Sequence, residues 1–378
     1  MVRRILMVAG EASGDLHGGK LVRALNANAD ELQIFGVGGD HMADAGMELL
    51  FHVADLAYVG FSEIIKHLPH FKRVFDTLIK TAIERKPDVV VLIDYPGFNL
   101  RIGKKLKALG FTIFYFIAPQ VWAWHRRRAQ KMASFIDRMA VIFDFEVEFF
   151  STYGIDTHFV GHPLVDSLSI HLERKVFFQK FNLDPQNPIL ALFPGSRKQE
   201  ITNLLPDMLV TAQHLRKKYP HLQIAAGLAD TISSDMIKPY VAEEGDIKII
   251  KGATFELMAF ATAGIVASGT ATLEAGYFQL PFVLLYRVSS LSYFLGKRLI
   301  KIPHIGLVNI VGQEELVKEY IQGNIHPASI AIELEKCLFD EPYRELKISR
   351  LSCIKQKLGE RGAAERTAAL VLGLIKDG

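Results

Sequence analysis

Short apolar runs rich in β-forming residues alternate with helical patterns along the first half of the chain. The runs read RILMVAG at 4–10, DVVVLID at 88–94, FTIFYFIA at 111–118 and RMAVIF at 138–143. Each is continuously apolar and is followed by a turn and a helical pattern, which is typical of buried parallel strands covered by helices on both faces. The pattern predicts a doubly wound unit.

The same alternation begins again in the second half of the chain. Its apolar runs lie at 188–196, 222–228, 247–250, 263–268 and 281–286. Because each run is again followed by a helical pattern, we predict a second unit of the same kind. The predicted fold class is α/β, with two Rossmann-like doubly wound domains whose strand ends face one another across a cleft.

Turn-forming residues mark the boundary between the two units. Residues 161–187 carry glycine and several prolines on either side of one amphipathic helical pattern at about 171–181. From about residue 326 the pattern is helical to the end. We predict an N-terminal domain at 1–168, a C-terminal domain at 169–340, and helices at 341–378 that cross back to the N-terminal domain or to a dimer partner.

Length and composition agree with two folded domains and exclude several other classes of protein. The 378 residues are 49% hydrophobic and 22% charged, as in globular domains of ordinary size. No apolar stretch approaches the roughly 20 residues that span a bilayer, and the first apolar run is too short for a signal peptide. Cys337 and Cys353 have no neighbouring histidines, so neither a zinc site nor a disulfide framework is expected. We expect a soluble or peripheral protein of the reducing cytoplasm.

Basic residues are clustered although the net charge is only +3. They gather at 126–131 and 297–301. Such clusters suit phosphate groups or an anionic membrane surface, and a solvated helix face explains them equally well. Because no basic stripe continues elsewhere along the chain, we expect no binding to nucleic acid.

The loop GEASGD at 10–15 follows the first predicted strand and opens a helix. Its small residues allow a ligand to approach the backbone closely. The unpaired amides of a helix N-terminus favour the binding of an anion or a sugar at Ser13 and Gly14. Its spacing matches neither the dinucleotide fingerprint nor a nucleophile elbow. Helix capping by Ser13 and Asp15 is the structural alternative.

The motif IDYPGFN at 93–99 places Asp94 at the carboxyl end of a buried strand, just before a Pro-Gly turn. A carboxylate there can accept the proton of an attacking sugar hydroxyl, as a general base does. The alternative is an Asx-turn in which Asp94 caps the turn at Pro96 and Gly97. Asn99, the last residue of the motif, is expected to be structural.

Both tryptophans of the chain lie in the block APQVWAWHRRR at 118–128. The aromatic faces of Trp122 and Trp124 can stack on sugars or acyl chains, and Arg126 and the two arginines after it can bind a phosphate. Packing between the domains is the alternative for the two tryptophans.

Two further loops repeat the design of strand, small residues and helix in the second unit. FPGSR at 193–197 supplies Gly195, Ser196 and Arg197, and SGTATLE at 268–274 supplies Ser268, Gly269, Thr270 and Glu274. The arginine and the loop amides suit a diphosphate, and the glutamate suits a ribose diol. The alternative role of Glu274 is as a partner of the helix dipole. Without a D-x-D motif before these loops, we predict no metal and no cofactor.

Residues 58–75 combine apolar residues at helical spacing with interspersed lysine and arginine. The apolar positions are Phe61, Ile64, Ile65 and Leu68. This pattern is typical of a helix that lies in a membrane interface. It is equally typical of an amphipathic helix whose apolar face is part of the core.

Taken together, these motifs and GHPLVD at 161–166 resemble the lipid-A-disaccharide synthase family, in that family's order, from about residue 5 to 322. The resemblance implies a GT-B glycosyltransferase that joins UDP-2,3-diacylglucosamine to 2,3-diacylglucosamine 1-phosphate with inversion, releasing UDP. It implies a peripheral location on the cytoplasmic face of the inner membrane, and homodimers formed by swapping of the C-terminal segment.

The resemblance also implies roles for single residues. Asp94 matches the proposed general base, Arg197 a donor-binding residue, Glu274 the acid on the ribose side and Asn309 an asparagine near the donor. The apolar patch that contacts the membrane falls on Phe61, Ile64, Ile65, Leu68 and Phe71. Two positions depart from the family pattern, because Glu314 stands where an arginine is usual and His125 intervenes before Arg126.

Two other functions remain open from the sequence. A nucleotide-sugar 2-epimerase shares the predicted architecture but needs no acylated acceptor, so its product would form from the donor alone. A non-catalytic clamp that binds a nucleotide or a lipid would bind without releasing UDP.

Overall fold

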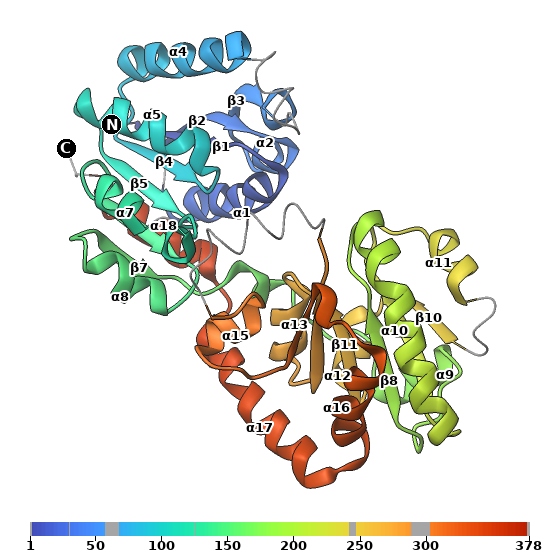
Figure 1. Cartoon of the computed structure of the whole chain (residues 1–378). Helices are drawn as coiled ribbons and strands as arrows, with labels where there is room; N and C mark the ends of the chain where they lie inside the picture. Colours follow the sequence, from blue (N-terminus) through green and yellow to red (C-terminus); the bar gives the residue numbers. More distant parts are fainter. Residues whose placement is uncertain are drawn as a thin grey trace. The chain divides into compact units, whose positions relative to one another are not determined.

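The computed structural model describes residues 2–29, 31–56, 68–124, 126–241, 247–288 and 303–375. The chain forms two compact units (Figure 1). Unit 1 comprises Met1–Asp166 and Leu358–Gly378, and unit 2 comprises Ser167–Lys357. The terminal segment at 341–378 is therefore divided, because most of its first helix belongs to unit 2 and its second helix belongs to unit 1.

Unit 1 is built on a sheet of seven parallel strands in the order β3-β2-β1-β4-β5-β6-β7. The order runs outward from β1 in both directions, which is the arrangement of a doubly wound sheet. The strands are β1 (Arg3–Ala9), β2 (Leu32–Gly38), β3 (Glu48–His52), β4 (Val89–Ile93), β5 (Ile113–Phe116), β6 (Arg138–Val141) and β7 (Asp156–Phe159).

Helices cover both faces of this sheet, because alternate residues of a strand point to opposite sides. Leu6 and Val8 of β1 lie in a core cluster with α4 and α5, whereas Ile5 and Met7 lie in a second cluster with α1 and α18. The helices of unit 1 are α1 (Ala12–Asn28), α2 (Asp40–Asp44), α4 (Leu68–Arg85), α5 (Pro96–Ala108), α6 (Val121–Trp124), α7 (Arg126–Met132), α8 (Phe145–Ser151) and α18 (Ala363–Leu372), with 3-10 turns at Val53–Asp55 and Pro163–Asp166.

The last helix of the chain completes unit 1. Helix α18, at the red end of the colour scale, packs against α1 at the blue end (Figure 1). Ala364, Ala368 and Val371 of α18 are buried at helical spacing in the cluster on that face. The segment before α18 is fixed by two hydrogen bonds, from the Gly362 amide to Asp166 Oδ1 at 2.9 Å and from the amide of His162 to the carbonyl of Leu358 at 2.7 Å.

Unit 2 contains six parallel strands in the order β10-β9-β8-β11-β12-β13. They are β8 (Ile189–Phe193), β9 (Gln223–Leu228), β10 (Ile247–Lys251), β11 (Ala263–Ala267), β12 (Phe282–Tyr286) and β13 (Glu319–Ile321). The helices are α9 (Arg174–Lys180), α10 (Lys198–Lys218), α11 (Ser234–Val241), α12 (Thr254–Phe260), α13 (Ala271–Tyr277), α15 (Leu307–Gly312), α16 (Pro327–Phe339) and α17 (Glu341–Leu358), with a 3-10 turn at Gln322–Asn324.

The prediction of two doubly wound α/β units is confirmed. All nine predicted apolar runs form strands, and β8 and β11 are buried at every position because helices cover both faces of the sheet. The strands that were not predicted are β2, β3, β7 and β13. Within the described ranges, no helix has both the length and the apolar composition that crossing a bilayer requires.

Candidate functional site

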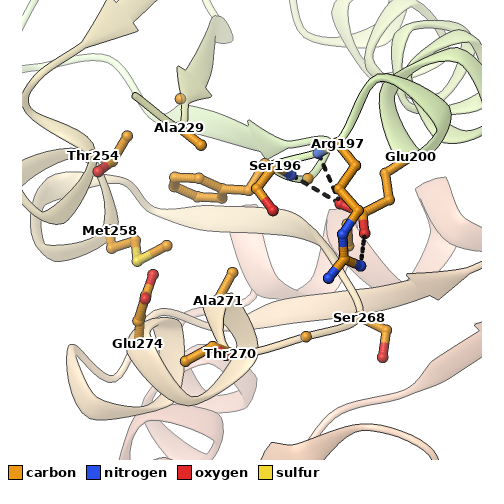
Figure 2. Close-up of a pocket in the computed structure, with 15 residues that line it drawn as sticks. Ser196, Arg197, Glu200, Ala229, Thr254, Met258, Ser268, Thr270, Ala271 and Glu274 are labelled. Atoms are coloured by element: carbon orange, nitrogen blue, oxygen red, sulfur yellow. Dashed lines mark hydrogen bonds and ion pairs between the residues drawn. The ribbon is translucent and has the colours of Figure 1, made fainter. Parts of the chain in front are cut away.

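A pocket of about 290 Å³ lies at the carboxyl ends of β8 and β11 in unit 2 (Figure 2). These two strands are neighbours in the sheet, so the loops that follow them meet at one edge. All seven residues predicted from the two loops line this pocket. Its lining consists of Phe193, Gly195, Ser196, Arg197, Glu200, Gly227, Ala229, Thr254, Met258, Ala267, Ser268, Gly269, Thr270, Ala271 and Glu274.

The first loop is shaped by Gly195 and held by Glu200. Gly195 has a φ of +113°, and a Cβ atom there would lie 2.3 Å from Glu200 Oε2. The same Oε2 atom accepts hydrogen bonds from the amides of Ser196 at 2.9 Å and Arg197 at 3.3 Å. These two amides are therefore already paired, contrary to the expectation that they are open to a phosphate. The signal for Glu200 was present in the sequence, as a glutamate three residues after the helix N-cap.

Arg197 keeps most of its hydrogen-bonding capacity free. Its Nη1 atom donates to Glu200 Oε1 at 2.9 Å, and 80% of its side chain is exposed. Figure 2 shows the guanidinium between the first loop and the loop that carries Ser268. Because a guanidinium has five N–H donors, Arg197 can bind Glu200 and a diphosphate at the same time.

The second loop supplies free donors and a buried carboxylate. Gly269 has a φ of +147°, and neither its amide nor that of Thr270 donates to an acceptor in the described part of the chain. One turn further on α13, burial raises the pKa of the Glu274 carboxyl from 4.5 to about 7. No hydrogen bond or ion pair within the described ranges engages this carboxylate. It can therefore accept hydrogen bonds from a ligand.

Asn309 does not line the pocket of unit 2. Its side chain is fully buried in α15, where Nδ2 donates to the carbonyl of Val317 at 2.8 Å and to Glu319 Oε1 at 2.9 Å. Its Oδ1 atom accepts from the amides of Leu316 and Val317. The amide is fully used to hold the segment that leads into β13. Nearby, Glu314 accepts a hydrogen bond of 2.7 Å from Arg350 Nη2.

A second pocket of about 290 Å³ lies in unit 1, at the carboxyl ends of β4, β5 and β6. Asp94 lines it, as the motif predicted, and among the described lining residues Arg128 is the only positively charged one. The exposed guanidinium of Arg128 forms no ion pair with any residue that the structure describes. The pocket is lined by Asp94, Pro96, Ile117, Ala118, Pro119, Gln120, Val121, Arg128, Ile142 and Phe143.

Asp94 is an unusually basic carboxylate for its type. Burial raises its pKa from 3.8 to about 6, and the nearby carboxylate of Glu11 adds to the shift, while a hydrogen bond from the Tyr95 amide opposes it. Helix α5 begins after Tyr95, whose own side chain forms no capping hydrogen bond. A carboxylate whose pKa is raised towards neutral pH in this way can act as a general base.

Trp122 packs within unit 1 and does not line the Asp94 pocket. Only 7% of it is exposed, and its Nε1 donates to Glu146 Oε1 at 3.0 Å. Burial raises the pKa of Glu146 to about 7. The side chains of Trp124 and Arg126 lie outside the described residues, as does His125. Arg128 is one of the arginines that the sequence offered for phosphate binding, whereas Glu146 was missed as the partner of Trp122.

Ser13 and Gly14 belong to unit 1 and lie in the first turn of α1. Ser13 is exposed, while Gly14 is buried against Ala9. Asp15 does cap a helix, but the helix is α2 and not α1. Its carboxylate accepts hydrogen bonds from the amides of Gly39, His41 and Met42 at the start of α2.

The predicted membrane patch is described only in part. Phe61, Ile64 and Ile65 and the side chain of Leu68 lie outside the described residues. Phe71, on α4, is half-buried and packs against the core of unit 1. In the described ranges, no three His, Cys, Asp or Glu side chains gather closely enough to hold a metal ion.

Known proteins match the chain in both sequence and fold. A family model described as lipid-A-disaccharide synthetase matches residues 5–371. The lipid-A-disaccharide synthase of Trichlorobacter lovleyi is 42% identical, covering 99% of this chain and 98% of the relative. The synthase of Geobacter sulfurreducens is 41% identical, with coverages of 98% and 97%.

Solved structures with much lower identity share the fold. The UDP-GlcNAc 2-epimerase from Neisseria meningitidis bound to UDP-GlcNAc superimposes with a TM-score of 0.63 at 12% identity, covering 98% of this chain and 100% of that one. CalG4, the calicheamicin glycosyltransferase, gives 0.58 at 16% identity and covers all of both chains. These likenesses confirm the predicted GT-B fold, and at such identities they show the fold alone.

Proposed function

Because the chain belongs to the lipid-A-disaccharide synthase family, as its motifs predicted, we propose that it joins UDP-2,3-diacylglucosamine to 2,3-diacylglucosamine 1-phosphate. Family membership makes it a glycosyltransferase of lipid A biosynthesis that uses a nucleotide-sugar donor and a lipid acceptor. The proposed products are UDP and the β(1→6)-linked disaccharide 1-phosphate.

The observation that carries the donor side is the pocket of unit 2. Arg197 offers an exposed guanidinium, Gly269 and Thr270 offer amides and Glu274 a carboxylate, and neither the amides nor the carboxylate has a partner among the described residues. The first three groups match a diphosphate, and the carboxylate matches the two hydroxyls of a ribose. We assign this pocket to UDP, with Arg197 on the phosphates and Glu274 on the ribose.

The acceptor side is assigned to the pocket of unit 1. The 6-hydroxyl of the acceptor attacks the anomeric carbon of the donor while Asp94 takes the hydroxyl proton, and the bond from that carbon to the diphosphate breaks. UDP leaves with the electron pair, and Arg197 balances its growing charge. A pKa of about 6 leaves Asp94 mainly ionised at neutral pH and more basic than an ordinary aspartate. Arg128 is suited to bind the acceptor phosphate.

Membrane contact and dimerisation complete the proposal. The acyl chains of both substrates require access to a lipid surface, and residues 61–71 carry the apolar positions suited to one. We assign the protein to the cytoplasmic face of the inner membrane and include a homodimer formed through the C-terminal segment.

The deciding experiment measures UDP release and product with the two lipid sugars supplied singly and together. Disaccharide and equimolar UDP that form only with both sugars support the proposal. A sugar epimerised from the donor alone would replace it with the 2-epimerase, and binding without UDP release would indicate a clamp.

A further inference from the structure

The backbone around Asp94 is held in a conformation that side chains with a Cβ atom disfavour. Asp94 has a φ of +44° and Tyr95 has a φ of +48°. Ile117, which follows the adjacent strand β5 and lines the same pocket, has a φ of +63°. A left-handed conformation is uncommon for non-glycine residues and is a true outlier for a β-branched one. Such conformations persist only where surrounding contacts enforce them, and they concentrate at functional sites.

One of the enforcing contacts is the side chain of Asn99. It is fully buried, and its Nδ2 atom lies within hydrogen-bonding distance of the carbonyl oxygens of Asp94 at 2.8 Å, Ile93 at 3.0 Å and Val8 at 3.3 Å. The amide cannot be turned around, because its oxygen would then face three carbonyl oxygens. Its Oδ1 atom accordingly has no partner among the described residues. Leaving a buried acceptor unpaired is unfavourable, so the contacts of Nδ2 compensate for it.

The second contact comes from Tyr115, in the middle of β5. Its ring is fully buried, and its hydroxyl donates to the carbonyl of Asp94 at 2.7 Å. The amide of Asp94 in turn donates to the carbonyl of Phe116 at 2.9 Å. Both backbone polar groups of Asp94 are therefore tied to the interior of the sheet. The direction of the Cα–Cβ bond follows from the positions of these two groups, since the Cα atom is tetrahedral.

We infer that Asn99 and Tyr115 are positioning residues that hold Asp94 with its carboxylate in the pocket of unit 1. This inference rests on the proposed function, in which Asp94 is the base. Two donors draw the Asp94 carbonyl inward, and the side chain is left to face the pocket. Without them, the backbone can return to a right-handed conformation, which swings the carboxylate away from the hydroxyl that it must deprotonate. A displacement of about 1 Å in a catalytic group lowers turnover by roughly a hundredfold.

The test replaces Tyr115 by phenylalanine, which removes one hydroxyl and keeps the buried ring. The matched control is Tyr320→Phe in unit 2, whose hydroxyl also donates to a backbone carbonyl, that of Ser329 at 3.2 Å. Both variants lose one hydrogen bond, but only Tyr115→Phe affects Asp94. We expect Tyr115→Phe to lower kcat at least about tenfold with KM changed less than about twofold, and Tyr320→Phe to leave both unchanged. Asn99→Ala should show the same pattern more strongly.

Titration of Asp94 provides a readout that needs no turnover. The carboxyl carbon of Asp94 is assigned by NMR from its absence in Asp94→Asn. Release of the carboxylate to solvent removes the burial that raises its pKa, so Tyr115→Phe should titrate at lower pH than the wild type, towards the ordinary value of 3.8. The acid limb of kcat should move in the same direction.

The outcomes separate the two ideas. An unchanged Asp94 titration and an unchanged kcat in Tyr115→Phe would overturn the positioning role, even if the variant were less stable. A shifted titration in a protein that forms no disaccharide would support the positioning role and refute the proposed function. If Asn99→Ala does not fold, the result for Tyr115→Phe alone decides whether the positioning role holds.

Discussion

Replacing Glu146 by glutamine should remove a specific pH dependence of stability from unit 1. Glu146 is 1% exposed, and its carboxylate accepts from Trp122 Nε1 at 3.0 Å and from the Phe143 amide at 3.2 Å. Burial outweighs these hydrogen bonds and raises its pKa from 4.5 to about 7. The folded state thus binds a proton that the unfolded state releases between these two pH values.

The sign and size follow from proton linkage. Because the folded state binds more protons between pH 4.5 and about 7, the Glu146 contribution to stability falls as pH rises through this window. At about 1.4 kcal/mol for each pH unit, the full loss is on the order of 3 kcal/mol. Glutamine has no charge to bury, so its variant lacks this loss. The glutamine side chain places its NH2 group against one of the two donors, which lowers the free energy of unfolding by about 1–2 kcal/mol at every pH.

The assay is urea unfolding followed by tryptophan fluorescence between pH 5 and 8. Both tryptophans of the chain lie in unit 1, so the signal reports that unit. The wild type should lose roughly 2.5 kcal/mol more than Glu146→Gln over this range, because part of the full loss falls below pH 5. Glu148→Gln, on the exposed side of the same helix, should behave like the wild type. Equal pH dependence in the wild type and Glu146→Gln would refute the reasoning.

Three further predictions concern the two pockets. Asp94→Asn should keep UDP affinity and lower kcat by about 10²–10⁴-fold, and normal turnover would exclude Asp94 as the base. Arg197→Ala should weaken UDP binding in calorimetry by roughly 10–100-fold, whereas the neighbouring Lys198→Ala, outside the pocket, should not. Because the pKa of Glu274 is about 7 and its ionised form accepts from the ribose, UDP affinity should rise as pH increases through 7. Glu274→Gln should abolish this rise, and an identical pH profile in that variant would place the ribose elsewhere.

Most interior strands of both sheets could be predicted from the sequence, whereas of the edge strands only β10 was predicted. Strands buried on both faces have continuous apolar runs, which is the clearest signal a sequence gives. β3, β7 and β13 lie at sheet edges, where a strand pairs with a neighbour on one side only. These strands are short or partly polar. β2 is interior, but Gly36 and Gly38 interrupt its apolar run.

The candidate site divides in the same way. Residues within one loop, such as Arg197 and Thr270, were found because their chemistry and position in the motif are local. Glu146 and Tyr115 act through partners more than 20 residues away in the sequence. Tyr115 in particular lies inside an apolar run, where the sequence indicates only a core strand. Asn309 was placed near the donor through family resemblance. In the structure its side chain forms hydrogen bonds that hold the segment leading into β13.

The return of α18 to α1 has a consequence for how the polypeptide is made. The strands of unit 1 are synthesised before unit 2, yet α18, the helix that covers one face of their sheet, is synthesised after it. Unit 2 can fold while the sheet of unit 1 still exposes an apolar face. We therefore expect chaperones to bind a nascent or prematurely terminated chain. A stop codon shortly before Ala363 should yield protein that aggregates, although every residue of both pockets has been synthesised.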